Sequence, residues 1–317
     1  RQIHTFTEVA RRGWFPHGEE IAAKGFDRLL ATAIPNEGAR GCVHALNDDG
    51  SIDQHLRDLY DQAFLILACA ARIKAGDNRA LTIARNTLSF LDREFASPFG
   101  GFRENDRGGH PRRQNPHMHL FEALLSLAAA TQDAGVLDRV HAVEALFRAK
   151  FYDPKAEALR EFFNDDWSFI EIVSDRIEPG HMAEWVALID RYERQTGEKR
   201  EALKRSLYEA ADARRIPGEP FVPDLALIGA RPAAGGRRLW PQTELLRAAT
   251  IMGQKLEAAT IIEALFNTYL AVDKEGLWTD EFDAAGERAP APVPASILYH
   301  IYEAVAAVAD ARGESRP

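Results

Sequence analysis

The stretch RQNPHMHLFEALLSLAAAT, from Arg113 to Thr131, decides the fold of this chain. After a polar start, leucines recur at the spacing of one buried helical face, at Leu120, Leu124, Leu125 and Leu127. Asn115 and Pro116 predict a helix start here, because Asn is a good N-cap and Pro suits the first helical position. Polar residues therefore stand at the N-terminal end of a core helix, where side chains can face a cavity.

Helical patterns of this kind dominate the chain. They cover Leu56–Ala75, Asn78–Phe95, Pro116–Ala130, Val136–Phe151, Met182–Thr196, Glu198–Ala213, Pro241–Met252, Lys255–Leu270 and Pro294–Ala311. Strand-like alternation is short and is best developed at Leu159–Phe163. We therefore predict an all-α fold with small hairpins in its loops. The first residues, RQIHTFTEVARRGWF, already have the pattern of a helix interior, so we expect further residues upstream of Arg1.

The helices repeat in pairs. Polar landmarks near helix starts recur 58 to 62 residues apart, at Tyr60, His119, His181, Gln242 and His300. This period corresponds to two helices plus their loops, and arrays of helical hairpins bury a continuous core by stacking neighbours. We predict a single domain over residues 1–317, since no long Pro/Gly/Ser-rich linker divides the chain. If the array closes into a ring, these landmarks converge on one cavity.

Composition excludes several classes of function. The 317 residues carry a net charge of −9, which disfavours binding to a phosphate backbone. The longest apolar run, Ala63–Ala71, is far shorter than the roughly 20 residues of a membrane helix. The two cysteines, Cys42 and Cys69, form no CxxC motif and suit a reducing compartment. We expect a cytoplasmic protein with no nucleic-acid or membrane partner.

Three histidines are candidates for chemistry. Asn115 and His119 lie four residues apart and share a helix face. The alternative interpretation is that Asn115 caps the helix and His119 is a structural histidine. In EPGHMAEW, His181 and Glu184 are spaced to touch, and the carboxylate would fix the imidazole tautomer, although a surface ion pair has the same spacing. His300 lies inside the last helix, where a core histidine is the alternative.

The segment RLWPQTE is another polar helix start. Trp240 is suited to stacking on a sugar face, with Gln242 and Glu244 bonding hydroxyls, or else the segment is a cap with a core Trp. The sequence contains no GxGxxG or GxxxxGK[ST] phosphate loop, no GxSxG motif and no Cys/His zinc spacing. We therefore expect no cofactor and no metal. Imidazoles and carboxylates suit proton transfer next to a carbonyl.

Taken together, these segments resemble the N-acylglucosamine 2-epimerase superfamily, and within it the D-mannose isomerase branch. The residues that carry the resemblance are RQIHTF, RDLYDQAF, GGFRE, RQNPHMHLFEA, EPGHMAEW, RLWPQTE and ILYHIYEA, spread over nearly the whole chain. The resemblance implies an (α/α)6 barrel, with roughly the first helix and its loop absent from this chain.

The resemblance also implies roles for single residues. His181, paired with Glu184, and the late histidine His300 would be catalytic. The substrate-binding residues would be Arg1, Tyr60, Asn115, His119, Trp240, Gln242 and Glu244. The implied partner is a small sugar, and the implied assembly is a monomer or homodimer.

The reaction we expect is isomerisation of an aldose to a ketose, of the D-mannose/D-fructose type, through a cis-enediolate. His300 is the expected C2/C1 base and His181 the ring-opening acid/base, with the reverse assignment left open. The alternatives are an N-acylglucosamine or cellobiose-type 2-epimerase and a non-catalytic carbohydrate-binding barrel. A phosphorylated sugar would need a basic cluster, for which the candidates are Arg112, Arg113, Arg237 and Arg238.

Overall fold

The computed structural model describes residues 1–35, 40–170, 173, 175–290 and 292–314. These residues form two compact units, which are described separately. Unit 1 comprises the described residues of Arg1–Phe151 together with residues 162–170, and unit 2 comprises Tyr152–Glu161 together with the described residues from 173 to 314. The prediction that 1–317 is a single domain stays a prediction.

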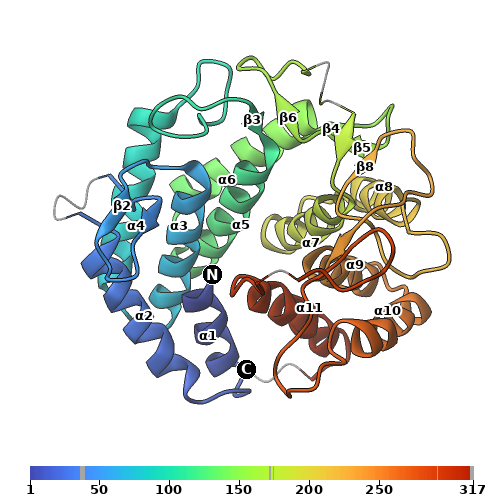
Figure 1. Cartoon of the computed structure of the whole chain (residues 1–317). Helices are drawn as coiled ribbons and strands as arrows, with labels where there is room; N and C mark the ends of the chain where they lie inside the picture. Colours follow the sequence, from blue (N-terminus) through green and yellow to red (C-terminus); the bar gives the residue numbers. More distant parts are fainter. Residues whose placement is uncertain (36–39, 171–172, 174, 291, 315–317) are drawn as a thin grey trace. The chain divides into compact units, whose positions relative to one another are not determined.

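Unit 1 is built from helical hairpins (blue to green in Figure 1). Its helices are α1 (Gln2–Arg11), α2 (Gly18–Thr32), α3 (Leu59–Lys74), α4 (Arg79–Phe90), α5 (Gln114–Thr131) and α6 (Ala134–Leu146), and two π-helical segments, η1 (Leu91–Phe95) and η2 (Phe147–Phe151), extend α4 and α6. Each odd-numbered helix packs on the even-numbered helix that follows it, and α3 also packs on both α1 and α5. The predicted core helix, α5, is apolar nearly all round and buried almost throughout.

Unit 2 repeats this arrangement (yellow to red in Figure 1). Its helices are α7 (Pro179–Thr196), α8 (Glu201–Asp212), α9 (Leu239–Ile251), α10 (Lys255–Thr268) and α11 (Ile297–Ala311). Helix α9 packs on α7, α10 and α11. From α3 to α11 the odd-numbered helices begin 55 to 65 residues apart, so the predicted pitch of the hairpins is confirmed.

Strands are confined to two-stranded antiparallel pairs in the loops. In unit 1, β1 (Ala45–Leu46) pairs with β2 (Ile52–Gln54), and β3 (Arg112–Arg113) pairs with β6 (Phe162–Phe163). In unit 2 the pairs are β4 (Tyr152–Asp153) with β5 (Ala158–Leu159), β7 (Arg176–Ile177) with β8 (Ala226–Leu227), and β9 (Arg237–Arg238) with β10 (Glu281–Phe282). The expected small loop hairpins are present, and the best predicted strand is split between β5 and β6.

The predicted helical ranges each correspond to a helix of the structure, and the start of α5 needs a correction. Its N-cap is Arg113, in extended conformation, and Asn115 lies inside the first turn rather than at the cap. Strand β3 holds the chain extended up to Arg113, which moves the helix start upstream of the Asn-Pro signal. Helix α2 was not among the predicted ranges, because Gly18 and Gly25 weaken its helical pattern. None of the described helices is long and apolar enough to cross a membrane.

Each unit contains one buried glutamine whose side-chain amide bonds both backbone groups of a residue in the preceding loop, and we call this arrangement a glutamine clamp. In α3, the side-chain amide of Gln62 donates to the carbonyl of Cys42 (2.9 Å) and accepts from its backbone N–H (2.9 Å). In α9, Gln242 makes the same pair of bonds to Val222, at 2.8 and 2.9 Å. Both glutamines reach back 20 residues, and they stand 180 residues apart in the sequence. Each clamp fixes the loop that leads into its helix, so the helix start is held by its own unit.

Candidate active site

His181 stands at the N-terminal end of α7 in unit 2. Glu178 occupies the N-cap position and Pro179 the first helical position, where proline is favoured because its missing N–H has no partner in the helix. The His181 side chain is buried, and its Nδ1 lies 3.1 Å from both carboxylate oxygens of Glu161 and 3.8 Å from Oε2 of Glu178. Two carboxylates, one from the segment after β5 and one from the N-cap of α7, therefore lie close to Nδ1 of His181.

These carboxylates change the acidity of the imidazole. Burial alone would lower the pKa of His181, but the charges of Glu161 and Glu178, the hydrogen bond to Glu161 and the charge of Glu184 raise it to about 10. Burial, supplemented by the charge of Glu161, raises the pKa of Glu178. His181 is therefore an imidazolium at neutral pH in this environment.

The structure gives His181 a carboxylate partner that the sequence did not single out. Glu184 was expected to orient this imidazole from one helical turn away, but the carboxylate bonded to Nδ1 is that of Glu161. Glu184 is buried, and it offers a carboxylate oxygen within 4.8 Å of ligand atoms of Glu244 and His300. The negative charge of Glu184 still raises the pKa of His181, which is an electrostatic effect and does not need a contact at Nδ1. A three-residue spacing permits a contact on a helix but does not select it over a partner from another element.

His300 has a carboxylate of its own. Its Nδ1 lies 2.8 Å from Oε1 of Glu244, which is fully buried in α9. The other oxygen of Glu244 lies 3.3 Å from Nη1 of Arg247, and Arg247 also pairs with Glu303 at 2.8 Å. Glu244 was expected to bind a sugar hydroxyl. In the structure the Glu244 carboxylate lies next to Nδ1 of His300. As a hydrogen-bond acceptor at this position, it keeps the proton on Nδ1.

Trp240 packs against both histidines. Its ring centroid is 5.1 Å from that of His181 and 5.6 Å from that of His300. Gly180 makes this packing possible, because a Cβ at that position would come within 2.7 Å of the Trp240 ring and 2.8 Å of Pro241. The predicted aromatic residue therefore stands beside both candidate acid/base groups of unit 2.

Gln242 was predicted to contact the sugar, and in the structure its side-chain amide bonds the protein backbone. Both ends of its amide bond the backbone of Val222, and Nε2 also donates to the carbonyl of Arg238 (3.0 Å). The side chain is fully buried. Its role in the structure is the clamp described above, which sequence polarity alone does not distinguish from a ligand contact.

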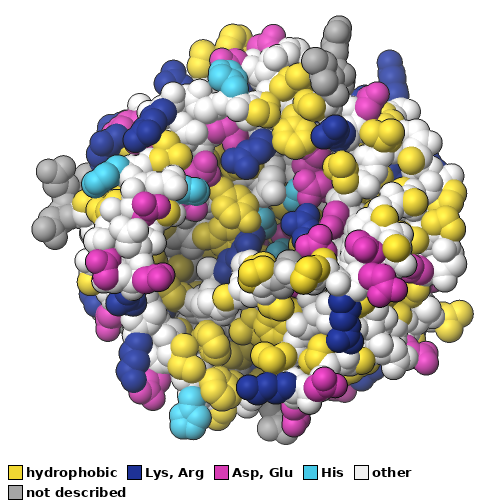
Figure 2. Space-filling model, viewed as in Figure 1, with side chains coloured by type: hydrophobic (Ala, Val, Ile, Leu, Met, Phe, Trp, Pro, Cys, Tyr) yellow, Lys and Arg dark blue, Asp and Glu magenta, His cyan; other side chains and the backbone are white. Residues whose placement is uncertain are grey.

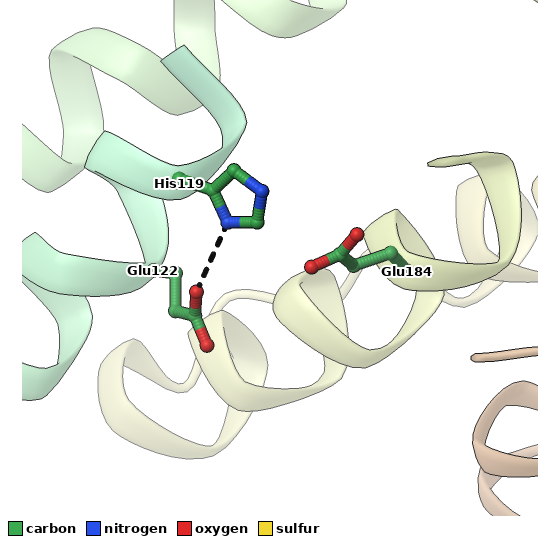
Figure 3. A group of neighbouring side chains, drawn as sticks. All are labelled: His119, Glu122 and Glu184. Carbon is green, nitrogen blue, oxygen red and sulfur yellow. Dashed lines mark hydrogen bonds and ion pairs between the residues drawn. The ribbon is translucent and has the colours of Figure 1, made fainter. Parts of the chain in front are cut away.

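In unit 1 the structure brings together three predicted residues. Arg1 donates to the hydroxyl of Tyr60, and its Nη2 lies 3.5 Å from Nε2 of His119. The guanidinium also stacks over Phe64, 4.1 Å from the ring centroid. His119 is held from behind by Glu122, whose Oε2 lies 3.3 Å from Nδ1, as Figure 3 shows. A cation, a phenol and an imidazole thus share one cluster.

The neighbours of His119 in sequence have other surroundings. Asn115 is half-buried in the first turn of α5. His117 points elsewhere, as predicted: its Nε2 accepts from the backbone N–H of Phe102 (3.0 Å), and its ring packs against Trp167. Burial, with the charge of Arg112, lowers the pKa of His117 to about 3. His117 is a neutral structural histidine.

The four arginines proposed for a phosphate divide into two kinds. Arg112 is buried, stacks on Trp167 with its guanidinium carbon 3.5 Å from the ring centroid, and donates to backbone carbonyls. Arg237 is likewise buried and pairs with Glu219. Arg113 and Arg238 have partly exposed side chains, which pair with Glu104 at 2.7 Å and Asp224 at 3.2 Å respectively. Buried Arg112 and Arg237 are therefore structural.

The charged side chains of both signs are mixed on the surface (Figure 2). On the described part of the face in Figure 2, Lys and Arg side chains are interspersed with Asp and Glu. This mixture is typical of a soluble surface that does not concentrate charge of one sign.

Two groups in unit 2 place ligand atoms close enough to surround a cation. They are Glu161, Glu178 and His181, and Glu184, Glu244 and His300. In both groups the Nδ1 of the histidine is within hydrogen-bond distance of a carboxylate oxygen of the same group. We therefore interpret these groups as imidazole–carboxylate pairs, whose chemistry is proton transfer.

Comparison with known proteins first gives the class. The structure superimposes on a cellobiose 2-epimerase from Spirochaeta thermophila with a TM-score of 0.87, at 20% identity, covering 99% of this chain and 85% of that one. It superimposes on a D-mannose isomerase with a TM-score of 0.84, at 19% identity, covering 98% and 86%. The predicted all-α fold of the (α/α)6-barrel class is confirmed.

The sequence comparison then gives the family. The family model for N-acylglucosamine 2-epimerase matches residues 1–304, and the chain belongs to that family of sugar isomerases and epimerases. It is 32% identical to a mannose-6-phosphate isomerase of Rhizobium meliloti over 96% of this chain and 83% of that protein. It is 26% identical to a D-mannose isomerase of Thermobifida fusca, over 91% and 78%. The protein is thus an enzyme of the isomerase class.

Proposed function

We propose that this enzyme interconverts an aldose and a ketose of the D-mannose/D-fructose type by histidine acid/base catalysis. The observation that carries the proposal is the arrangement in unit 2, where two buried imidazoles, each with a carboxylate at Nδ1, pack against one tryptophan. The similarity to proteins named mannose-6-phosphate isomerase and D-mannose isomerase supports the choice of reaction.

In the proposed mechanism both imidazoles act through Nε2. His181, as an imidazolium, donates a proton to the ring oxygen while the anomeric hydroxyl loses its proton, which opens the ring and exposes the C1 aldehyde. His300 then removes the C2 proton, giving a cis-enediolate, and returns a proton to C1. The carbonyl moves from C1 to C2 as O1 gains a proton and O2 loses one, so no redox partner is needed.

The cluster of unit 1 supports the same chemistry through binding. Arg1, Tyr60 and His119 supply a cation and polar hydrogens, which are groups that bind sugar oxygens and stabilise developing negative charge. We propose that these residues hold the sugar and that they take no proton from C2.

The second candidate is a 2-epimerase, which the pair of histidines and the similarity to a cellobiose 2-epimerase of Dictyoglomus turgidum favour. Epimerisation needs a proton removed from one face of C2 and returned to the other. His181 and His300 would then both act on C2, and Trp240 would support the sugar between them.

Proton NMR of the enzyme with D-mannose in D2O tests the proposal, with D-mannose 6-phosphate run in parallel. We expect fructose partly deuterated at C1, lost in both His181→Asn and His300→Asn and kept in His55→Asn, whose side chain is exposed. Glucose without fructose would support the epimerase. Turnover of the phosphorylated sugar alone would identify a sugar-phosphate isomerase. An enzyme that exchanges no C2 proton in mannose, its 6-phosphate or cellobiose would contradict both reactions.

A further inference from the structure

Glu161 comes to His181 from a rigid part of unit 2. It follows β5 by two residues, and the two residues of β5, Ala158 and Leu159, are fully buried. Strand β5 pairs with β4 and packs against α7 and α8. Glu161 is itself only 2% exposed. The backbone on both sides of the His181–Glu161 contact is therefore held by packing, which fixes the distance between the carboxylate and α7.

The carboxylate meets the imidazole at one nitrogen only. Both oxygens of Glu161 lie 3.1 Å from Nδ1 of His181, and Glu178 adds a second carboxylate, whose Oε2 lies at 3.8 Å. A carboxylate at this position accepts the Nδ1–H, which selects the tautomer and ring orientation and leaves proton transfer to Nε2.

We propose that Glu161 is a positioning residue, which holds the proton on Nδ1 of His181 and directs Nε2 toward the substrate. The inference rests on the proposed acid/base role of His181. It adds, to the predicted pairing of His181 with Glu184, a pairing with a residue 20 positions upstream. It leaves Glu184 in the group with Glu244 and His300.

The charges around His181 determine what Glu161 does to its protonation. Glu161, Glu178 and Glu184 favour the imidazolium, while burial disfavours it. The charges of Arg238 and Asp224 act on the pKa of Glu178 with opposite signs. Since Glu161 supplies both the largest favourable charge and the hydrogen bond, it keeps His181 in the acid form that ring opening requires.

The experiment compares Glu161→Gln with a matched control, Glu157→Gln. Glutamine keeps the size and an accepting oxygen but removes the charge. Glu157 is a nearby glutamate whose carboxylate pairs with Arg231. Long-range ¹⁵N–¹H NMR of histidine-labelled full chain reports the protonation of His181 without any turnover. We expect its titration midpoint to fall by about one pH unit or more in Glu161→Gln and to stay unchanged in Glu157→Gln.

Kinetics give the second readout. The alkaline limb of kcat should move to lower pH in Glu161→Gln, so that a shift of about one pH unit lowers kcat about twofold near pH 9 and leaves it unchanged near pH 6. A folded Glu161→Gln, by circular dichroism, with a wild-type His181 titration would overturn the proposal. So would a pH-independent loss of activity. Because the NMR titration needs no substrate, failure of the positioning role is distinguishable from failure of the isomerase proposal.

Discussion

Oε1 of Glu244 lies 2.8 Å from Nδ1 of His300, although 56 residues separate the two in sequence. The contact joins two adjacent helices of unit 2, α9 and α11, and it is buried from solvent. Since the carboxylate accepts from Nδ1, we propose that proton transfer takes place at Nε2. The relationship ties the candidate base to the packing of these two helices.

Replacing Glu244 by Gln should therefore reduce catalysis more than stability. We expect kcat to fall about 10- to 100-fold with little change in KM, because the imidazole loses the charge that stabilises its protonated form. Steady-state kinetics at several pH values measure this. Glu303→Gln is the control, because Glu303 also pairs with Arg247. An equal loss of kcat in both variants would show that Arg247, rather than the imidazole, carries the effect.

Gly180→Ala should disturb the packing of Trp240. The added Cβ would lie 2.7 Å from the indole ring and 2.8 Å from Pro241, so the ring or α7 must shift. Overpacking of this kind costs about 1–3 kcal/mol, and we expect a lower Tm together with a lower kcat. Gly229→Ala, with nothing within 4 Å of its Cβ, should leave both unchanged. A wild-type Tm and kcat in Gly180→Ala would mean that the indole ring moves away without consequence.

Gln242→Ala should behave as a stability variant. It leaves the buried N–H and C=O of Val222 unpaired, at a cost of about 1–3 kcal/mol for each unsatisfied group. Thermal unfolding should show a lower Tm, and Gln62→Ala in unit 1 should show a comparable fall. If Gln242→Ala instead raised KM tenfold at an unchanged Tm, Gln242 would be a sugar contact after all.

His117 and His119 should separate stability from activity within α5. His117→Ala removes the acceptor of the Phe102 N–H and a buried ring, so we expect a marked fall in Tm. His119→Asn keeps a polar side chain and should mainly raise KM, because His119 lies beside Arg1 and Tyr60. Urea unfolding and kinetics on both variants check the contrast, which would be contradicted if His117→Ala kept its stability and lost sugar affinity.

Stability should fall as the pH rises above neutrality, and His181 should contribute to the fall. The folded-state pKa of about 10 lies above the usual histidine value near 6.5, so the native state holds a proton that the unfolded state has lost between these values. The stabilisation is complete below pH 6.5 and disappears as the pH rises through 10. Urea unfolding at pH 6, 8 and 10 should show a smaller decline in His181→Gln than in the wild type. Equal declines would assign the loss to other groups.

The helices were predictable because a buried face repeats every three to four residues over long stretches. In helix α5, the period of the apolar residues located the helix. The first residue of the helix was set by the pairing of Arg113 in β3, which the period does not indicate. The same period also separated the surroundings of His117 from those of His119. Local spacing is enough for such conclusions because helix geometry is local.

The carboxylate of His181 was not predictable in the same way. Sequence spacing pointed to Glu184, a neighbour on the helix, whereas Glu161 reaches Nδ1 because β5 packs on α7. The available signal was a glutamate inside the short strand-like segment Leu159–Phe163, and nothing in that pattern specifies the distant histidine. The backbone bonds of Gln242 were not predictable for a related reason, since a polar side chain at a helix start can bond either a ligand or the backbone.

The two glutamine clamps also bear on how this scaffold tolerates change. Positions 60 and 64 beside the first clamp are Tyr and Phe, whereas the corresponding positions 240 and 244 beside the second are Trp and Glu. In each unit, the incoming loop is anchored through its backbone at Cys42 or Val222, so the anchor does not depend on the side chains that line the helix start. Mutational drift, or a protein engineer exchanging these loops, can therefore alter the neighbouring side chains while the glutamine preserves the register of the loop.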